Sequence, residues 1–100
     1  MQVDPDEDGA LRDGAAQCPC CDFYSLQERG SFEICPVCYW EDDGQDLDRL
    51  DEVSGPNHIT LRAARLNFER LGAADAAAVS LVATPAARAG LRREQRATYF

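Results

Sequence analysis

The sequence lacks the segments that direct a protein out of the cell or into a membrane. No apolar run approaches the roughly 20 residues needed to cross a bilayer. The first residues, MQVDPDEDGALRDGAAQ, are acidic and rich in Gly and Ala, so they do not resemble a secretory signal. We therefore expect a cytoplasmic protein. In that reducing compartment, closely spaced cysteines bind metal or carry out redox chemistry more often than they form structural disulfides.

Groups that commonly support catalysis are also scarce. The chain has no lysine and a single histidine, His58, and it has no Gly-rich loop for a phosphate. A lone histidine is more often structural than catalytic, and no nucleophile has an evident base partner. We therefore do not expect an enzyme.

Charge is unevenly distributed along the chain. Residues 1–59 carry fifteen Asp and Glu against three Arg, a balance of −12, whereas residues 60–100 carry seven Arg against three acidic residues, a balance of +4. The formal net charge of −8 repels phosphate backbones, so nucleic-acid binding is not expected, although the basic last third leaves a small exception open.

Five cysteines are the most informative feature of this 100-residue chain. Cys18 and Cys21 form one C-x-x-C pair, Cys35 and Cys38 form a second, and thirteen residues separate the pairs. Four thiolates at this spacing can converge on one tetrahedral ion, which would cross-link a core too small to be stable alone. The spacing therefore predicts a four-cysteine metal site.

The residues around the cysteines suggest how the pairs meet. Pro19 and Pro36 suit tight turns, because proline has a fixed φ and no N–H. The linker DFYSLQERGSFEI predicts an antiparallel hairpin between Phe23–Leu26 and Ser31–Ile34, with Gly30 supplying a positive φ in the turn. The expected fold class is a small α+β domain with a zinc-ribbon-like hairpin followed by one or two helices.

Zinc is the expected ion, and iron is the alternative because four tetrahedral thiolates accept both metals. Disulfides or independent redox pairs remain a minor alternative. Cys20 is the surplus sulfur, and its side chain should point away from the ion. It is interpreted as a small half-buried side chain in preference to a redox-active thiol. His58 could replace one cysteine as a ligand, but four better-spaced sulfurs disfavour this.

The stretch CPCCDFYSLQERGSFEICPVCYWEDDGQD, followed by GPNHITLRAARLNFERLGA, resembles the cysteine-rich CPCC domain family over about residues 17–73. The resemblance implies a small, mostly bacterial, zinc-binding protein without an established activity. Asp22 departs from the glycine usual after such knuckles, which puts the local turn in question. We accordingly divide the chain into an acidic flexible arm (1–16), a CPCC zinc-binding domain (17–73) and a helical extension (74–100).

The second half of the chain predicts two helices. Thr60 is a suitable N-cap and Gly72 a suitable C-terminal residue for a helix whose apolar stripe packs on the hairpin and Trp40. Thr84 and Pro85 predict the start of another helix, weakened at Gly90. The stripe consists of Leu61, Ala64, Phe68 and Leu71, and the residues expected largely off it, and available to pair with the acidic loop, are Arg62, Arg65 and Arg70.

Tyr39 and Trp40 are expected to cover the metal in a small core, with ligand stacking as the minority interpretation. The acidic residues after them lack the spacing of an EF-hand, so a solvated loop is favoured over a calcium site. These residues are Glu41, Asp42, Asp43, Asp46, Asp48 and Asp51.

The predicted function is a small zinc-binding module that acts by protein–protein interaction in an accessory or regulatory role, including an inhibitory, immunity-type one. Its contact surface is expected in the acidic loop 41–52, the C-terminal helix 85–100, or both. The alternatives are a rubredoxin-like iron protein that transfers electrons and a thiol redox protein that uses Cys20.

Overall fold

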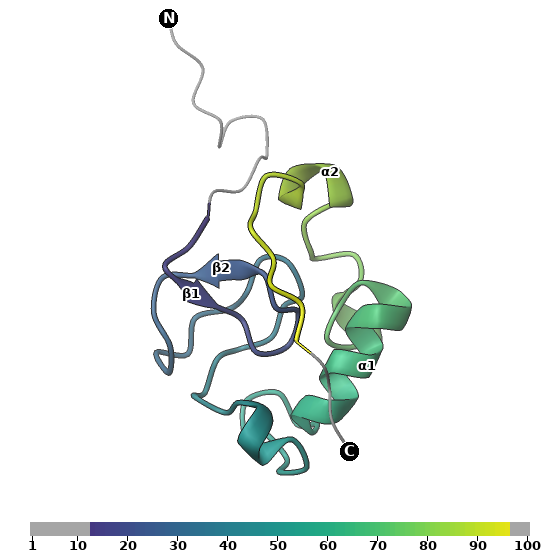
Figure 1. Cartoon of the computed structure of the whole chain (residues 1–100). Coiled ribbons are helices and arrows are strands. Elements are labelled where there is room, and N and C mark those ends of the chain that lie inside the picture. The colour runs from purple at the N-terminus through teal and green to yellow at the C-terminus, as the bar shows by residue number, and fades with distance from the viewer. Residues whose placement is uncertain (1–12, 97–100) are drawn as a thin grey trace, which may run out of the picture.

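A computed structural model describes residues 13–96 of the chain (Figure 1). Within this range it is a small α+β fold, as predicted, with one two-stranded antiparallel sheet and two α-helices. No helix in the described range is long and apolar enough to span a bilayer. In chain order the elements are β1 (Ala16–Gln17), β2 (Tyr24–Leu26), the 3₁₀ turn η2 (Leu47–Arg49), α1 (Leu61–Leu71), the 3₁₀ turn η3 (Ala76–Ala78) and α2 (Pro85–Arg88).

The strand pairing differs from the prediction. β2 pairs with β1, with Ala16 opposite Leu26, and not with residues 31–34. Ile34 instead forms an isolated bridge with Glu41. Each C-x-x-C turn reverses the chain within a few residues, so the segments that flank one turn are already antiparallel neighbours. The predicted hairpin between the two pairs was therefore wrong, and each pair closes its own short hairpin.

Helix α1 confirms the predicted boundaries. The Thr60 side chain accepts a hydrogen bond from the Ala63 N–H, and Gly72 ends the helix with a φ of 80° while its N–H donates to the Phe68 carbonyl. Leu61, Ala64 and Phe68 are buried as expected.

Two side chains of α1 are placed differently from the prediction. Leu71 is 47% exposed. Arg65, expected off the apolar stripe, is only 6% exposed. The helix packs across the first cysteine turn, and the buried carboxylate of Asp22 lies within hydrogen-bond distance of the Arg65 guanidinium.

The core is built around the cysteines themselves. Trp40 is fully buried with them, as expected, together with Leu26, Val37 and Leu61. Tyr39, predicted to share that role, is 40% exposed. Its φ of 73° turns the chain between the buried Cys38 and the buried Trp40, so adjacent side chains point in opposite directions.

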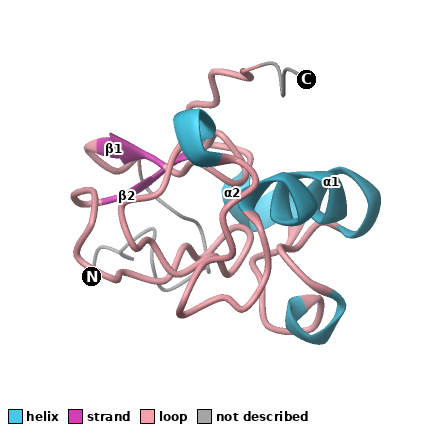
Figure 2. Cartoon of the chain, turned by 90° about the horizontal axis from the view of Figure 1, so that it is seen from below, coloured by secondary structure: helices cyan, strands magenta, loops and turns pink. Residues whose placement is uncertain are grey.

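The last described residues return to the first cysteine turn. Thr84 caps the short helix α2, which starts at Pro85 as predicted but ends at Arg88, so the predicted helix 85–100 is wrong for residues 89–96. The chain then runs beside β2 (yellow in Figure 1), where the Tyr24 N–H donates to the Arg92 carbonyl at 2.9 Å. Figure 2 shows the two strands on one side of the domain and α1 on the other. The predictions for most of the arm, residues 1–12, and for Tyr99 and Phe100 lie outside the described residues.

Candidate metal centre

Four sulfur atoms meet at the centre of the domain. The Sγ atoms of Cys18, Cys21, Cys35 and Cys38 all lie within 4.8 Å of one another, and the four residues are at most 1% exposed. The Cys18–Cys38 and Cys21–Cys35 sulfurs are each 3.7 Å apart. A disulfide bond is about 2.0 Å long, so these distances join free cysteines.

The donor set fits a tetrahedral metal ion. Zn–S bonds of about 2.3 Å in a tetrahedron place neighbouring sulfurs about 3.8 Å apart, close to the two distances above. All four donors are soft and equivalent in type, which suits Zn²⁺ and iron alike. The site can therefore hold either metal, and its geometry does not select between them.

The two cysteine turns have the same local structure. In the first, the Cys18 N–H donates to the Phe23 carbonyl and the Asp22 N–H to the Cys18 carbonyl, both at 2.9 Å. In the second, the Cys35 N–H donates to the Trp40 carbonyl at 2.9 Å, and the Tyr39 N–H donates to the Cys35 carbonyl at 2.8 Å. This internal repeat presents two sulfurs from each turn to the same point.

The residue after each pair has a left-handed conformation. Asp22 has a φ of 68° and Tyr39 a φ of 73°. Glycine adopts such angles freely, and aspartate tolerates them better than most other residues. The aspartate at position 22 is therefore compatible with the same turn geometry.

Burial and hydrogen bonding together shift the pKa values of the four thiols. It raises the pKa of Cys18, Cys21 and Cys38 well above the ordinary value, because a thiolate loses hydration inside the domain. Burial also raises the pKa of Cys35, but hydrogen bonds from the other thiols and from Ser25 outweigh it, so that pKa is lowered. Four buried thiolates repel one another strongly, and a divalent cation between them removes that cost.

Cys35 receives hydrogen bonds from outside the cluster. The Ser25 hydroxyl lies 3.0 Å from the Cys35 sulfur, and the Val37 N–H donates to the same sulfur at 3.3 Å. Ser25 belongs to β2, the strand that follows the first cysteine turn, so this contact joins that strand to a cysteine of the second turn. Such contacts stabilise a metal-bound thiolate and restrict its rotation.

We expect Ser25→Ala to weaken zinc binding about tenfold while preserving the fold, because one hydrogen bond to a metal-bound thiolate is lost. Competition against a chromophoric chelator measures this affinity. Ser31→Ala is the matched control, because Ser31 is exposed and makes no hydrogen bond within residues 13–96. Equal zinc affinity in the two variants would contradict a role for the hydroxyl.

The other candidate ligands lie outside the cluster. Cys20 is 3% exposed but does not belong to the four-sulfur group. His58 is exposed in a turn with a φ of 62°, where its N–H donates to the Ser54 carbonyl. His58 is not placed with the four sulfurs, whereas the Cys20 thiol lies close enough to Cys38 to add to the effect of burial in raising the pKa of Cys38.

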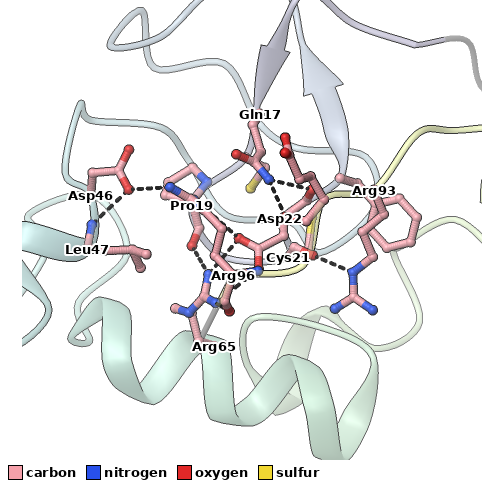
Figure 3. A network of polar contacts seen from close by, with 12 residues as sticks. Gln17, Pro19, Cys21, Asp22, Asp46, Leu47, Arg65, Arg93 and Arg96 are labelled. Atoms are coloured by element: carbon pink, nitrogen blue, oxygen red, sulfur yellow. Dashed lines mark hydrogen bonds and ion pairs between the residues drawn. The ribbon is translucent and has the colours of Figure 1, made fainter. Parts of the chain in front are cut away.

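Asp22 is the centre of a buried polar network that the sequence analysis did not anticipate (Figure 3). Its two carboxylate oxygens accept hydrogen bonds from the Arg65 guanidinium at 2.8 and 3.0 Å. They also accept bonds from the backbone N–H and the side chain of Arg96, at 2.7 and 3.1 Å. Arg65 in turn donates to the Pro19 carbonyl at 2.6 Å. One carboxylate thus joins the first cysteine turn, α1 and the C-terminal segment.

A second part of the network uses the acidic loop. Asp42 is fully buried and pairs with Arg29 at 2.9 Å. Asp46 pairs with Arg29 and also with Arg96, whose Nη1 lies 3.1 Å from it. These bonds lower the pKa of Asp46 against the opposing effect of burial. Much of the loop is therefore internal structure and not a solvated surface.

The predicted pairing between α1 and the acidic loop is confirmed for one arginine only. Arg62 pairs with Asp51 at 2.7 Å. Asp43 is also used inside the protein, where it accepts from the Ser54 hydroxyl at 2.9 Å.

Comparison with known proteins gave one finding. A family model described as "Cysteine-rich CPCC" matches residues 16–89, which includes both cysteine turns, α1 and α2. No curated protein and no solved structure matches the chain.

Proposed function

Because the chain belongs to the cysteine-rich CPCC family and gathers four buried thiols at one point, we propose that it is a zinc-binding module that acts by contacting another protein. The four-sulfur cluster carries this proposal. Zinc bound by four thiolates is coordinatively saturated and serves as a structural cross-link. The ion would supply much of the folding free energy of a domain with very short strands.

The saturated coordination of the zinc ion also argues against catalysis. A catalytic zinc site keeps one position for water or substrate, whereas here all four positions would be filled by side chains that are at most 1% exposed. The proposal therefore assigns no catalytic residue.

Elemental analysis of reduced, tag-free protein tests the identity of the metal. We expect about one zinc ion per chain and no absorption in the visible range. A red or brown protein with one iron per chain would instead support the rubredoxin-like alternative, because iron–thiolate centres absorb visible light. Protein that contains neither metal would contradict both.

The surface that contacts the partner remains part of the proposal. The sequence pointed to the acidic loop 41–52, to the segment 85–100, or to both. Asp42, Asp43 and Asp46 make internal contacts, which leaves fewer carboxylates for a basic or immunity-type partner. The proposal therefore rests mainly on the C-terminal segment.

Cross-linking in the native host tests for a partner. We expect the zinc-loaded chain to be recovered joined to a specific protein, and Cys35→Ser to lose that product because the folded surface is absent. Metal-dependent turnover of a substrate by the isolated protein would contradict the non-catalytic role.

A further inference from the structure

Three arginines near the end of the described residues lack the carboxylate partners that most of the other arginines have. Ion pairs with carboxylates hold Arg29, Arg49, Arg62, Arg65 and Arg96. Within residues 13–96, Arg88, Arg92 and Arg93 make no ion pair, although the protein has a net charge of −8. In so acidic a protein, a cluster of cations without carboxylate partners is unexpected.

Aromatic rings hold these three guanidinium groups in place. The central carbon of the Arg88 guanidinium lies 5.4 Å from the Phe23 ring centroid and 5.2 Å from that of Phe68. The corresponding Arg93 distances are 5.1 and 5.6 Å. The two rings pack edge to face with centroids 6.3 Å apart, so two like charges share one aromatic pair.

The third cation is stacked in the same region. The Arg92 guanidinium lies 3.8 Å from the Tyr24 ring centroid. The nearby Glu94 carboxylate accepts a hydrogen bond from the Tyr24 hydroxyl at 2.7 Å. Arg93 uses only its Nε to bond the Cys21 carbonyl, so its terminal amino groups have no hydrogen-bond partner within residues 13–96.

We propose that Arg88, Arg92 and Arg93, the arginine surface, bind an acidic peptide segment of a partner protein. The inference rests on the proposed protein-binding function and names the partner's chemistry. Guanidinium groups pair with carboxylates through two parallel hydrogen bonds, and stacking on rings reduces the side-chain freedom lost on binding. Carboxylates placed among the three cations also relieve their mutual repulsion.

A peptide suits this surface better than a nucleic acid does. At this surface the rings of Phe23, Tyr24 and Phe68 already carry guanidinium groups, so they are not free to stack on bases. A long polyanion would also meet the acidic remainder of a protein with a pI of about 4.4. A short run of carboxylates needs to contact only the arginine surface.

Fluorescence anisotropy with the zinc-loaded full chain tests this inference. The probe is a fluorescein-labelled peptide with six consecutive glutamates, and the same peptide with six glutamines is the reference. We expect salt-sensitive binding of the glutamate peptide only, and a loss of at least about tenfold in affinity for Arg88→Gln/Arg92→Gln. This variant keeps the bond between Arg93 and the first cysteine turn.

Arg49→Gln/Arg70→Gln is the matched control, because it changes the net charge equally and both arginines are exposed. Its affinity should match that of the unchanged protein. Equal loss in both variants, no difference between the two peptides, or tighter binding of a twelve-nucleotide oligothymidylate would overturn the inference. Concentration-dependent self-association that these arginine substitutions abolish would also overturn it, in favour of a second copy.

These outcomes are separate from the proposed function. Zinc content and metal-dependent folding are measured on the same samples without a peptide. A partner that cross-links through another surface would leave the protein-binding role intact while the arginine surface is rejected.

Discussion

Removing the metal is expected to unfold at least residues 17–73. The buried core consists largely of the four cysteines and the side chains that pack on them, and the sheet contains strands of only two and three residues. Binding of structural zinc is worth about 10–16 kcal/mol in zinc-finger peptides, which is as large as the whole net stability of an ordinary domain. Circular dichroism and Trp40 fluorescence after chelation under reducing conditions should show loss of helix and exposure of the indole to water.

Single cysteine substitutions separate ligation from mere burial. Cys21→Ser and Cys35→Ser should lose the metal and most of the structure, because three thiolates bind zinc less tightly and leave the hydroxyl buried. Cys20→Ser should keep both, since Cys20 lies outside the cluster. If Cys20→Ser releases the metal while Cys21→Ser retains it, the ligand assignment is wrong. A chelated protein that keeps its helix content would contradict the structural role of the ion.

Asp22→Ala is expected to destabilise the zinc-loaded protein by about 3–5 kcal/mol, because it leaves a buried arginine without its counter-charge. The side chains of Asp22 and Arg65 are only 2% and 6% exposed, so water cannot replace the lost carboxylate. The substitution also removes the acceptor for the Arg96 backbone, which loosens the last described residues of the C-terminal segment. Urea denaturation with zinc in excess measures the change in unfolding free energy.

The backbone and the charge at position 22 can be separated. Asp22→Gly accepts the φ of 68° without strain but lacks the carboxylate. If the ion pair is decisive, it should be nearly as unstable as Asp22→Ala. If the left-handed turn is decisive, Asp22→Gly should be as stable as the unchanged protein, and our account of Asp22 would be wrong.

The clustering of the four cysteines was the part most accessible from the sequence. Ligand spacing is a local property, and two C-P-x-C turns present sulfurs in the same way wherever they occur. Helix α1 was equally accessible, because Thr60 and Gly72 act within a few residues of the helix ends. The family resemblance rested on the same local motifs.

Features that depend on distant partners were missed. Residues 23–26 were predicted to pair with residues 31–34 because both runs suit strands. Residues 24–26 pair instead with β1, the strand that precedes the first cysteine turn. Arg65 was expected off the apolar stripe because arginine is usually exposed. Its burial depends on Asp22, 43 residues away in the chain. No local sequence pattern indicates a partner that far away. Asp22 itself was interpreted only as a departure from the usual glycine, and its role as an ion-pair partner was not predicted.

X-ray absorption at the zinc K-edge of purified, reduced protein tests the central claim most directly. Our account predicts four sulfur neighbours at about 2.3 Å and no nitrogen or oxygen ligand. A first shell that contains a lighter atom, or fewer than four sulfurs, would contradict a site closed by Cys18, Cys21, Cys35 and Cys38.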